Sequence, residues 1–207
     1  PAGARGGSHE PVRGGREFSP DGRFVYFASR DGWISKFDLH NLRMVAEVRA
    51  GINTRNAAVS SDGRYVMVAN YLPHTLVALD ARDLAPLKVI PVRDVHGKSS
   101  RVSAVYDAAP RESFIAALKD VKEIWEIPYG ANAEPVYKGL VHDYKMKEGI
   151  AETGPFPVRQ IQIDDYMDDF FFDRSYANVV GAARDAKNAQ VVNLYVKRRI
   201  ESIELSG

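Results

Sequence analysis

Histidines and paired carboxylates are the residues that first suggest chemistry, because this sequence contains no cysteine. The histidines are His9, His40, His74, His96 and His142. No two of them have the spacing that places ligands on one side of a strand or helix, so the sequence has no zinc motif. Asp143 follows His142 and could orient its ring, although a contact between His and Asp at the surface is the commoner outcome.

Two carboxylate pairs, Asp164-Asp165 and Asp168-Asp169, precede three consecutive phenylalanines, Phe170–Phe172. Like charges crowded beside an apolar run raise the pKa of one carboxyl group, which suits a general acid or base. The alternative is a water-exposed turn that leads into a strand. The sequence leaves both interpretations open.

Arginines recur in polar stretches between strand-like runs. These stretches are Ser29–Asp31, Asn53–Asn56, Asn70-Tyr71 and Ser99–Arg101. The guanidinium fork pairs with a carboxylate through two hydrogen bonds, so a cluster of arginines suits a ligand with several carboxylates. The alternative is a set of Arg–Asp contacts between neighbouring structural units.

Composition narrows the functional classes. The chain has 207 residues, of which 45% are hydrophobic and 27% charged, as in ordinary globular proteins. Its formal net charge of +1 argues against nucleic acid as a partner. The lack of cysteine excludes disulfides, thiolate zinc sites, iron–sulfur clusters and covalent c-type haem in these residues. No apolar run is long enough to span a membrane. The start lacks both an initiator Met and a signal peptide, as expected of a segment of a longer protein.

An internal repeat organises the chain. Ser19–Arg23 (SPDGR) recurs as Ser60–Arg64 (SSDGR), a shift of 41 residues from position 19 to position 60. In both copies an Asp-Gly turn is followed by strand-like runs, predicted at 24–28, 34–38 and 45–49 and at 65–69, 76–80 and 87–91. Asp-Gly pairs suit tight hairpin turns, and a period of about 40 to 45 residues with several strands is typical of a β-propeller blade.

Two further copies are degenerate. The third has predicted strands at 114–118 and 123–127, and the fourth has them at 178–182 and 190–195. Between them, residues 130–167 are rich in Gly, Pro and charge and are predicted to form a long loop with one short strand, at the same end of the blades as the site.

The sequence therefore predicts an all-β fold of about four propeller blades. We expect a flexible lead-in over residues 1–17 and a partial propeller over 18–207. Since propellers usually close with about four to eight blades, either a second copy in a homodimer or the missing half of a larger propeller would complete it.

Four runs carry a resemblance to a known family: SRDGW, RAGINTRN, NYLPHTL and SSRVSAVYD. With the segment from Gly14 onward, they resemble the haem d1-binding propeller shared by haem d1 nitrite reductases and haem d1 biosynthesis proteins. The resemblance implies an eight-bladed propeller that holds a tetrapyrrole at its centre, of which this chain contains about half. It also implies a periplasmic location, and a c-type cytochrome domain or another electron acceptor as partner.

The resemblance implies which residues bind haem d1 or its dihydro precursor. The matching positions are Arg30, Arg55, Asn56, Tyr71 and Arg101. The family has an axial His directly before the Gly-Gly pair, where this chain has Arg13, so His9 is the expected metal ligand. The catalytic residues stay unassigned.

The leading hypothesis is an oxidoreductase of haem d1 biosynthesis that converts a propionate of dihydro-haem d1 to an acrylate. One alternative is nitrite reduction to nitric oxide in denitrification. Against it, Asp168 and its neighbours stand where the resemblance would place a His. The other alternative is a non-enzymatic propeller that presents its loops to a protein partner.

Overall fold

Antiparallel four-stranded sheets form the described part of the chain, which in this computed structural model is residues 16–138, 150–152, 154–183 and 186–205. The first sheet contains β1 (Arg16–Phe18), β2 (Phe24–Ala28), β3 (Trp33–Asp38) and β4 (Arg43–Arg49). The second contains β5 (Asn53–Val59), β6 (Tyr65–Leu72), β7 (Thr75–Asp80) and β8 (Pro86–Pro91). In both sheets the strands lie in chain order, so each sheet is a meander.

The third and fourth sheets repeat this order. The third contains β9 (Val102–Ala108), β10 (Ser113–Leu118), β11 (Glu123–Pro128) and β14 (Arg159–Gln162), with the short 3-10 helix η1 (Ala109–Arg111) between β9 and β10. The fourth contains β15 (Asp169–Phe172), β16 (Asn178–Ala182), β17 (Asn188–Asn193) and β18 (Arg198–Glu204). No helix in the described ranges is long and apolar enough to cross a membrane. The predicted all-β fold is confirmed.

The Asp-Gly turns explain why the first two sheets begin alike. Gly22 and Gly63 have φ values of 69° and 72°, in the left-handed region that favours glycine. In the first turn the hydroxyl of Ser19 accepts the N–H of Phe24 at 2.8 Å, and Ser60 makes the equivalent bond in the second. These side-chain bonds replace ladder bonds at the hairpin and set the register of the strands that follow.

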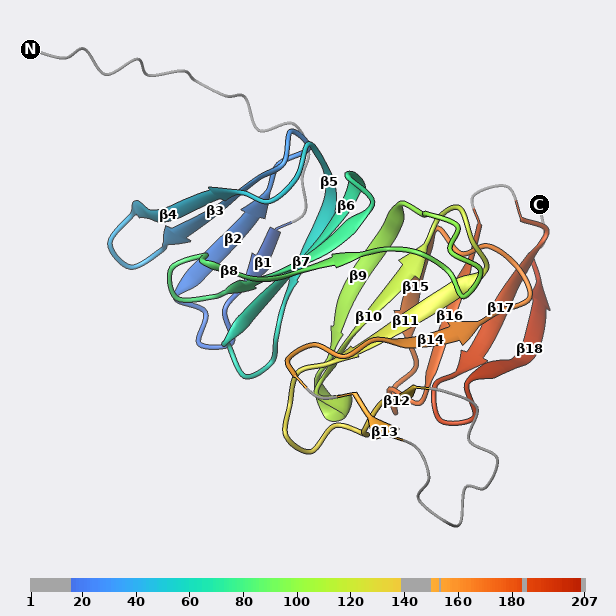
Figure 1. Cartoon of the computed structure of the whole chain (residues 1–207). Helices are drawn as coiled ribbons and strands as arrows, with labels where there is room; N and C mark the ends of the chain where they lie inside the picture. Colours follow the sequence, from blue (N-terminus) through green and yellow to red (C-terminus); the bar gives the residue numbers. More distant parts are fainter. Residues whose placement is uncertain (1–15, 139–149, 153, 184–185, 206–207) are drawn as a thin grey trace, which may run out of the picture.

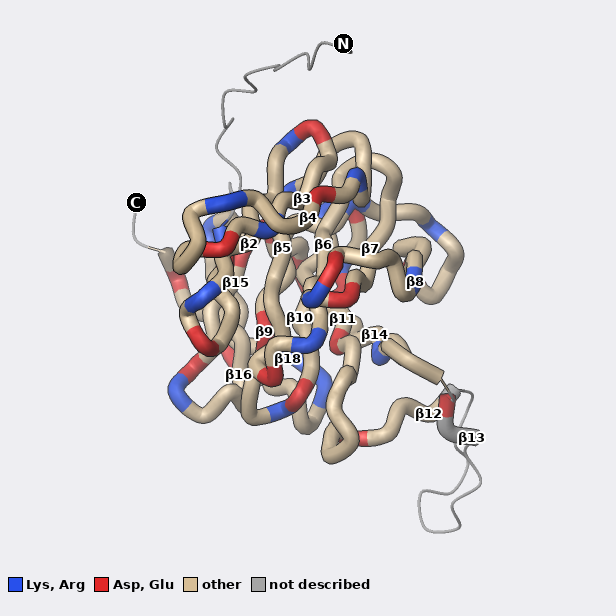
Figure 2. Tube along the Cα trace, turned by 90° about the vertical axis from the view of Figure 1, so that its left-hand side faces the viewer, with Lys and Arg blue, Asp and Glu red and all other residues tan. Residues whose placement is uncertain are grey.

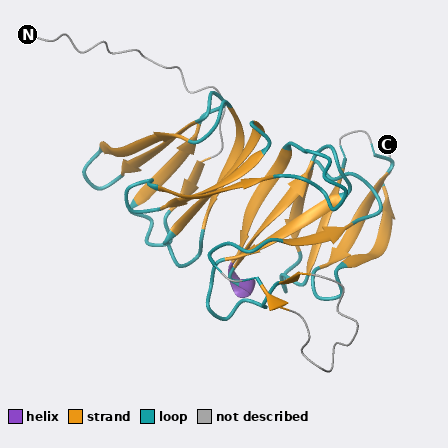
Figure 3. Ribbon diagram, viewed as in Figure 1, coloured by secondary structure: helices purple, strands orange, loops and turns teal. Residues whose placement is uncertain are grey.

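The sheets are arranged side by side like the blades of a fan (Figures 1 and 3). The first strand of each sheet is innermost, and β5 lies against both β1 and β9. Three apolar clusters fill the spaces between successive sheets, and their buried members include Ile34 and Val66, Met67 and Phe114, and Ile115 and Phe170. Burying each large aliphatic side chain is worth about 1.5 to 3 kcal/mol, so packing between blades holds the arc together.

The strand directions define two ends of the blades. We call upper the end at which β2, β6 and β10 finish and β5, β9 and β15 begin, which is the top in Figure 1. The lower end carries the Asp-Gly turns. Basic and acidic residues are interspersed along the trace (Figure 2), and in one Asp-Gly turn Nε of Arg64 lies 2.7 Å from Oδ2 of Asp62.

Three details differ from the sequence-based expectations. Asn53–Asn56, expected as a connector, begins strand β5, and Arg16-Glu17, expected in the lead-in, belongs to β1. The described residues between 130 and 167 contain three strands rather than one: β12 (Tyr137–Lys138), its partner β13 (Ile150–Ala151), and β14, which completes the third sheet. β12 and β13 have two residues each and β14 has four, and in β14 the alternation of buried Ile161 with exposed Gln160 and Gln162 is too short to stand out in a segment rich in Gly, Pro and charge.

Candidate functional site

The predicted binding residues within the described ranges gather at the upper end of the blades. Arg30 follows β2, Arg55 and Asn56 lie near the start of β5, and Tyr71 lies near the end of β6. Arg101 directly precedes β9. The antiparallel meander brings them to one end, because inner strands begin where second strands finish. The predicted metal ligand His9 lies outside the described residues.

Arg101 is held by Asp120, which lies in the turn between β10 and β11. Both oxygens of Asp120 accept from the guanidinium, with Oδ2 2.9 Å from Nε and Oδ1 2.5 Å from Nη2. The backbone N–H of Arg101 also donates to Oδ2 at 2.9 Å. Arg101 holds the pKa of this carboxyl at about 2, below its usual value of 3.8. The guanidinium carbon also lies 5.4 Å from the centre of the Tyr71 ring.

Arg55 and Asn56 connect the second sheet to the third. The side-chain amide of Asn56 donates to the carbonyl of Val105 at 2.8 Å and accepts the N–H of Val105 at 3.1 Å. Nε of Arg55 donates to the carbonyl of Ser103 at 3.1 Å. These bonds satisfy the inner edge of β9, which has no further strand beside it in its own sheet. The Asn56 amide is thus engaged with the backbone, while the Arg55 side chain is exposed.

Arg30 is exposed, and its carbonyl accepts the N–H of Thr54 at 3.2 Å. This bond ties the loop after β2 to the start of β5. The side chains of Arg30 and Arg55 therefore reach solvent at the same end of the first two blades. Both retain guanidinium donors for a ligand at this end.

Sequence reasoning missed several polar contacts near these arginines. Lys119 pairs with Asp168 between the third and fourth sheets, and Nδ1 of His74 lies 2.6 Å from the hydroxyl of Ser99. Asp169 accepts a hydrogen bond from the hydroxyl of Tyr106 at 2.8 Å. Burial raises the pKa of Tyr106, and Asp169 adds to the increase. Both members of the second carboxylate pair thus contact side chains of the third blade, a pairing that only the fold reveals.

A second polar cluster lies at the lower end. The hydroxyl of Tyr129 donates to Oδ1 of Asp107 at 2.7 Å and lies 2.9 Å from the hydroxyl of Ser61. Burial raises the pKa of Asp107 to about 6. It also raises the pKa of Glu17 on β1, and repulsion from Asp107 adds to that shift. The inner strands therefore hold two carboxyl groups whose pKa values lie above those of the free side chains.

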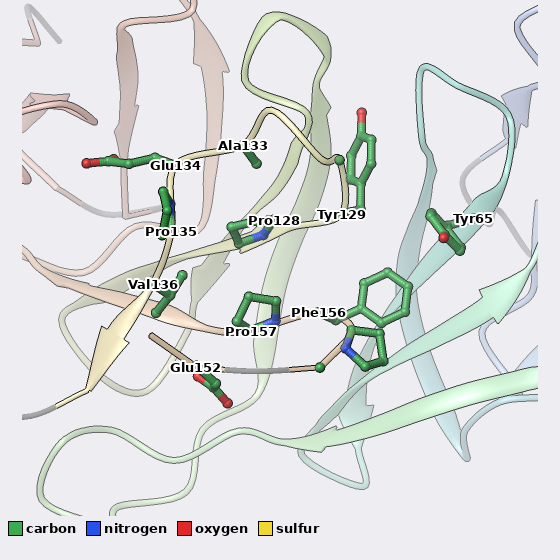
Figure 4. A pocket seen from close by; sticks show the side chains of 13 residues that line it. Tyr65, Pro128, Tyr129, Ala133, Glu134, Pro135, Val136, Glu152, Phe156 and Pro157 are labelled. Carbon is green, nitrogen blue, oxygen red and sulfur yellow. The ribbon is translucent and has the colours of Figure 1, made fainter. Parts of the chain in front are cut away.

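A pocket of about 220 Å³ opens at the lower end beside this cluster (Figure 4). Tyr65, Tyr129 and Phe156 form one side, and four prolines contribute to its lining. The segment that follows β11 borders it with Glu134 and Val136. The prediction that residues 130–167 lie at the same end as the arginines is wrong for this part, because β11 runs antiparallel to β10 and returns the chain to the lower end.

A buried ionic network anchors the same segment. Glu126 on β11 accepts from Nε of Arg111 at 2.8 Å and also binds Arg159 on β14. Nη2 of Arg159 donates in turn to the carbonyls of Glu134 and Pro135, at 2.9 and 3.0 Å. This network joins β14 to the border of the pocket.

These features define the class of protein: a run of propeller blades in which Arg30, Arg55 and Arg101 lie at one end. The chain belongs to the cytochrome d1 haem domain family, which it matches over residues 4–206. The predicted family resemblance is confirmed.

Among curated proteins, the chain is 51% identical over 204 residues to the dihydro-heme d1 dehydrogenase of Pseudomonas aeruginosa. That match covers 99% of this chain and 37% of the relative. The protein NirF of the same organism is 36% identical over 57% of the chain and 30% of the relative. The nitrite reductase of Stutzerimonas stutzeri is 26% identical over 85% of the chain and 31% of the relative. The chain thus spans only 30% to 37% of the length of the curated relatives it matches.

Among solved structures, the dihydro-heme d1 dehydrogenase NirN in complex with DHE matches with a TM-score of 0.80 and 52% identity. The match covers 94% of this chain and 37% of that one. The β-propeller domain of Myceliophteria thermophila Cps50 (Swd1) matches with a TM-score of 0.67 at 14% identity, over 95% of this chain and 57% of that one. At that identity the likeness shows the propeller fold alone. Together with the four sheets, these matches confirm the prediction of a partial propeller.

Proposed function

We propose that this chain forms part of the propeller of an oxidoreductase of haem d1 biosynthesis, with dihydro-haem d1 as its substrate. The observation that carries the proposal is the 51% identity to a dihydro-heme d1 dehydrogenase over 99% of the chain. An identity of this size, spread over all four blades, favours a shared ligand as well as a shared fold.

The residues at the upper end fit a tetrapyrrole with several carboxylates. Arg30 and Arg55 are exposed there, and the Arg101 side chain is 40% exposed. Guanidinium groups pair with carboxylates through charge-assisted hydrogen bonds. We propose that these three arginines bind substrate carboxylates and that Tyr71 supports Arg101. Asn56 contributes by fixing the distance between the inner strands of the second and third blades.

The proposed reaction converts a propionate side chain to an acrylate. One carbon–carbon single bond becomes a double bond, and two protons and two electrons leave the substrate. We propose that the electrons pass to a c-type cytochrome domain or to a separate electron acceptor. The 207 residues contain no cysteine for covalent haem, so such a domain belongs to another part of the protein or to another chain.

The ligand of the iron, the location and the completion of the propeller are also proposals. We propose that His9 would bind the iron of the cofactor, because Arg13 occupies the expected position and a guanidinium stays protonated at working pH. We propose that the protein is periplasmic, as the family resemblance implies. The other blades would come from the rest of a longer chain or from a second copy.

Nitrite reduction is the second candidate, and the 26% identity to the nitrite reductase of S. stutzeri favours it. The fourth blade weakens this candidate. There Asp168, bound to Lys119, stands where the resemblance would place a proton-donating His.

The test uses the full-length protein with dihydro-haem d1 under anaerobic conditions and an added electron acceptor. We expect the absorption spectrum to change to that of haem d1 as the acceptor is reduced, with two electrons transferred per substrate. Nitric oxide formed from nitrite by the haem d1-loaded protein, without that conversion, would favour nitrite reduction. If the absorption spectrum does not change on mixing, the result would favour the alternative of a non-enzymatic propeller.

A further inference from the structure

We propose that Asp120 is a positioning residue for ligand binding, which holds the guanidinium of Arg101 so that its outer edge binds a substrate carboxylate. The inference rests on the proposed function, and it identifies a residue that sequence reasoning did not select. Asp120 lies in the turn between β10 and β11, at the upper end of the third blade.

Asp120 occupies one edge of the guanidinium. Its two oxygens accept from Nε and Nη2 of Arg101, and the backbone N–H of Arg101 binds the same carboxylate. Each guanidinium has a second edge, formed by Nη1 and the other hydrogen of Nη2. Since Asp120 uses the first edge, the second edge is the one that can receive a ligand. The exposed fractions of the two side chains, 40% for Arg101 and 26% for Asp120, leave solvent access to it.

The backbone around Asp120 is fixed as firmly as its carboxylate. The hydroxyl of Ser100, a fully buried residue, accepts the N–H of Asp120 at 3.0 Å and donates to the carbonyl of Arg101 at 2.9 Å. Nζ of Lys98 donates to the carbonyl of Asp120 at 2.6 Å. A free arginine loses side-chain entropy when it is ordered by a ligand. Here the fold has already ordered the side chain before a ligand arrives.

Tyr71 supports the guanidinium from the neighbouring blade. Its ring centre lies 5.4 Å from the guanidinium carbon, within the range of a cation–π contact. Asp120 therefore controls the direction of the fork within its plane, and Tyr71 limits its movement out of that plane. This support comes from the second blade, so Arg101 is positioned at the junction of two blades.

The chain contains a matched control at the opposite end. Asp80 binds the backbone N–H of Arg82 at 2.8 Å, Nε at 3.1 and 3.2 Å, and Nη2 at 2.7 Å. This pair has the same donor pattern as Arg101 and Asp120 but lies at the lower end. Its removal controls for the loss of an Arg–Asp pair at a site far from a ligand bound at the upper end.

The experiment titrates full-length wild type, Arg101→Ala, Asp120→Ala, the double variant and Asp80→Ala with two probes, followed by absorbance. The probes are dihydro-haem d1 and its methyl ester, whose former carboxylates are neutral. We expect Arg101→Ala and Asp120→Ala each to weaken binding of the acid about tenfold or more, with little effect on the ester. The double variant should resemble Arg101→Ala alone, because Asp120 acts through Arg101.

Asp80→Ala should leave both affinities unchanged. Asp120→Asn, which keeps one acceptor oxygen, should weaken binding of the acid less than Asp120→Ala, and it serves as the second variant if the alanine variant does not fold. The inference would be overturned if the losses of affinity in the two single variants added up in the double variant. It would also be overturned if the acid and the ester lost affinity equally, or if Arg101→Ala bound the acid as tightly as the wild type. Tighter binding by Asp120→Ala would show instead that Asp120 competes with the ligand. A wild-type protein that binds neither probe would reject the proposed function itself.

Discussion

Asp107 shows how strongly a single position on an inner strand is controlled by its surroundings. Its carboxyl group lies at the lower end, bonded to the hydroxyl of Tyr129, and burial raises its pKa to about 6. In the unfolded chain its pKa is near 3.8. The folded protein therefore binds a proton more tightly than the unfolded chain, and the free energy of unfolding depends on pH through this group.

The raised pKa determines how the free energy of unfolding changes with pH. The stability that neutral Asp107 provides is fully present below about pH 3.8 and is lost as the pH rises through 6. We expect Asp107→Asn, which cannot ionise, to raise the free energy of unfolding at pH 8 by about 1 to 2 kcal/mol after allowance for solvent screening. The gain should vanish near pH 4. Urea unfolding at several pH values measures it.

Asp38 affects the pH dependence of stability in the opposite direction. Its hydrogen bond with Arg23 lowers its pKa, so the charged form is favoured in the folded protein. Asp38→Asn should destabilise the protein at pH 8, and the loss should shrink as the pH falls. A gain at pH 8 from Asp38→Asn, or none from Asp107→Asn, would contradict this account.

At the scale of elements, neighbouring inner strands are joined by side chains, because each has one edge without a partner in its own sheet. Asn56 on β5 binds both backbone groups of Val105 on β9. Asn56→Ala would leave a buried N–H and carbonyl without these partners. We expect it to lower the free energy of unfolding by about 2 to 3 kcal/mol, measured in urea. Ser35→Ala, which removes an exposed bond to Glu47, is the control and should cost less than about 1 kcal/mol.

The outer strand β14 depends on charge rather than on apolar packing alone. Glu126 lies buried between Arg111 and Arg159, and the side chain of each arginine is less than one-tenth exposed. Removing one partner of a buried ionic group leaves the others without compensation, at a cost of about 3 to 5 kcal/mol. We expect Glu126→Gln to destabilise the protein by about this amount in urea. Asp62→Asn, at an exposed ion pair with Arg64, should cost less than about 1 kcal/mol.

At the scale of the molecule, the first and last sheets each present an apolar face away from the other blades. Phe18, Phe27 and Met44 are exposed on the first sheet, and Phe171 and Ile203 on the last. The strand pairing places these residues on the faces opposite the buried clusters. Exposed apolar faces of this kind favour association. A further blade or a second copy would cover them.

This feature gives a prediction for the four blades produced by themselves. We expect residues 16–205 to bind a hydrophobic dye and to self-associate in sedimentation experiments, and Phe27→Lys with Phe171→Lys to reduce both effects. In the full-length protein the same two substitutions should instead lower the stability. A monomeric segment that binds no dye would show that these faces need no cover.

The sequence predicts the two middle strands of each blade better than the inner strand. The Asp-Gly pairs make the repeated turns readable, and apolar residues make β2, β3, β6 and β7 readable. Buried positions alternate along β3, whereas Val66–Asn70 of β6 and Thr75–Leu79 of β7 are buried on both faces. The inner strand Asn53–Val59 escapes prediction, because Arg55 and Asn56 bind the backbone of the next blade instead of alternating with apolar residues. The repeat predicts that Arg30, Arg55 and Arg101 lie at one end of the blades. Asp120, which holds Arg101, becomes visible only when β10 and β11 are paired.

β14 is synthesised well after β11, and this delay affects folding during translation. Residues 129–158 separate β14 from β11, the strand with which it pairs. A ribosome adds roughly 5 to 20 residues per second, so the outer edge of β11 stays unpaired for roughly two to six seconds after β11 is complete. Unpaired edges attract other strands, and during that interval the nascent chain is exposed to mispairing at β11. The lower pocket, which β14 anchors through Arg159, is therefore one of the last features of the third blade to form during translation.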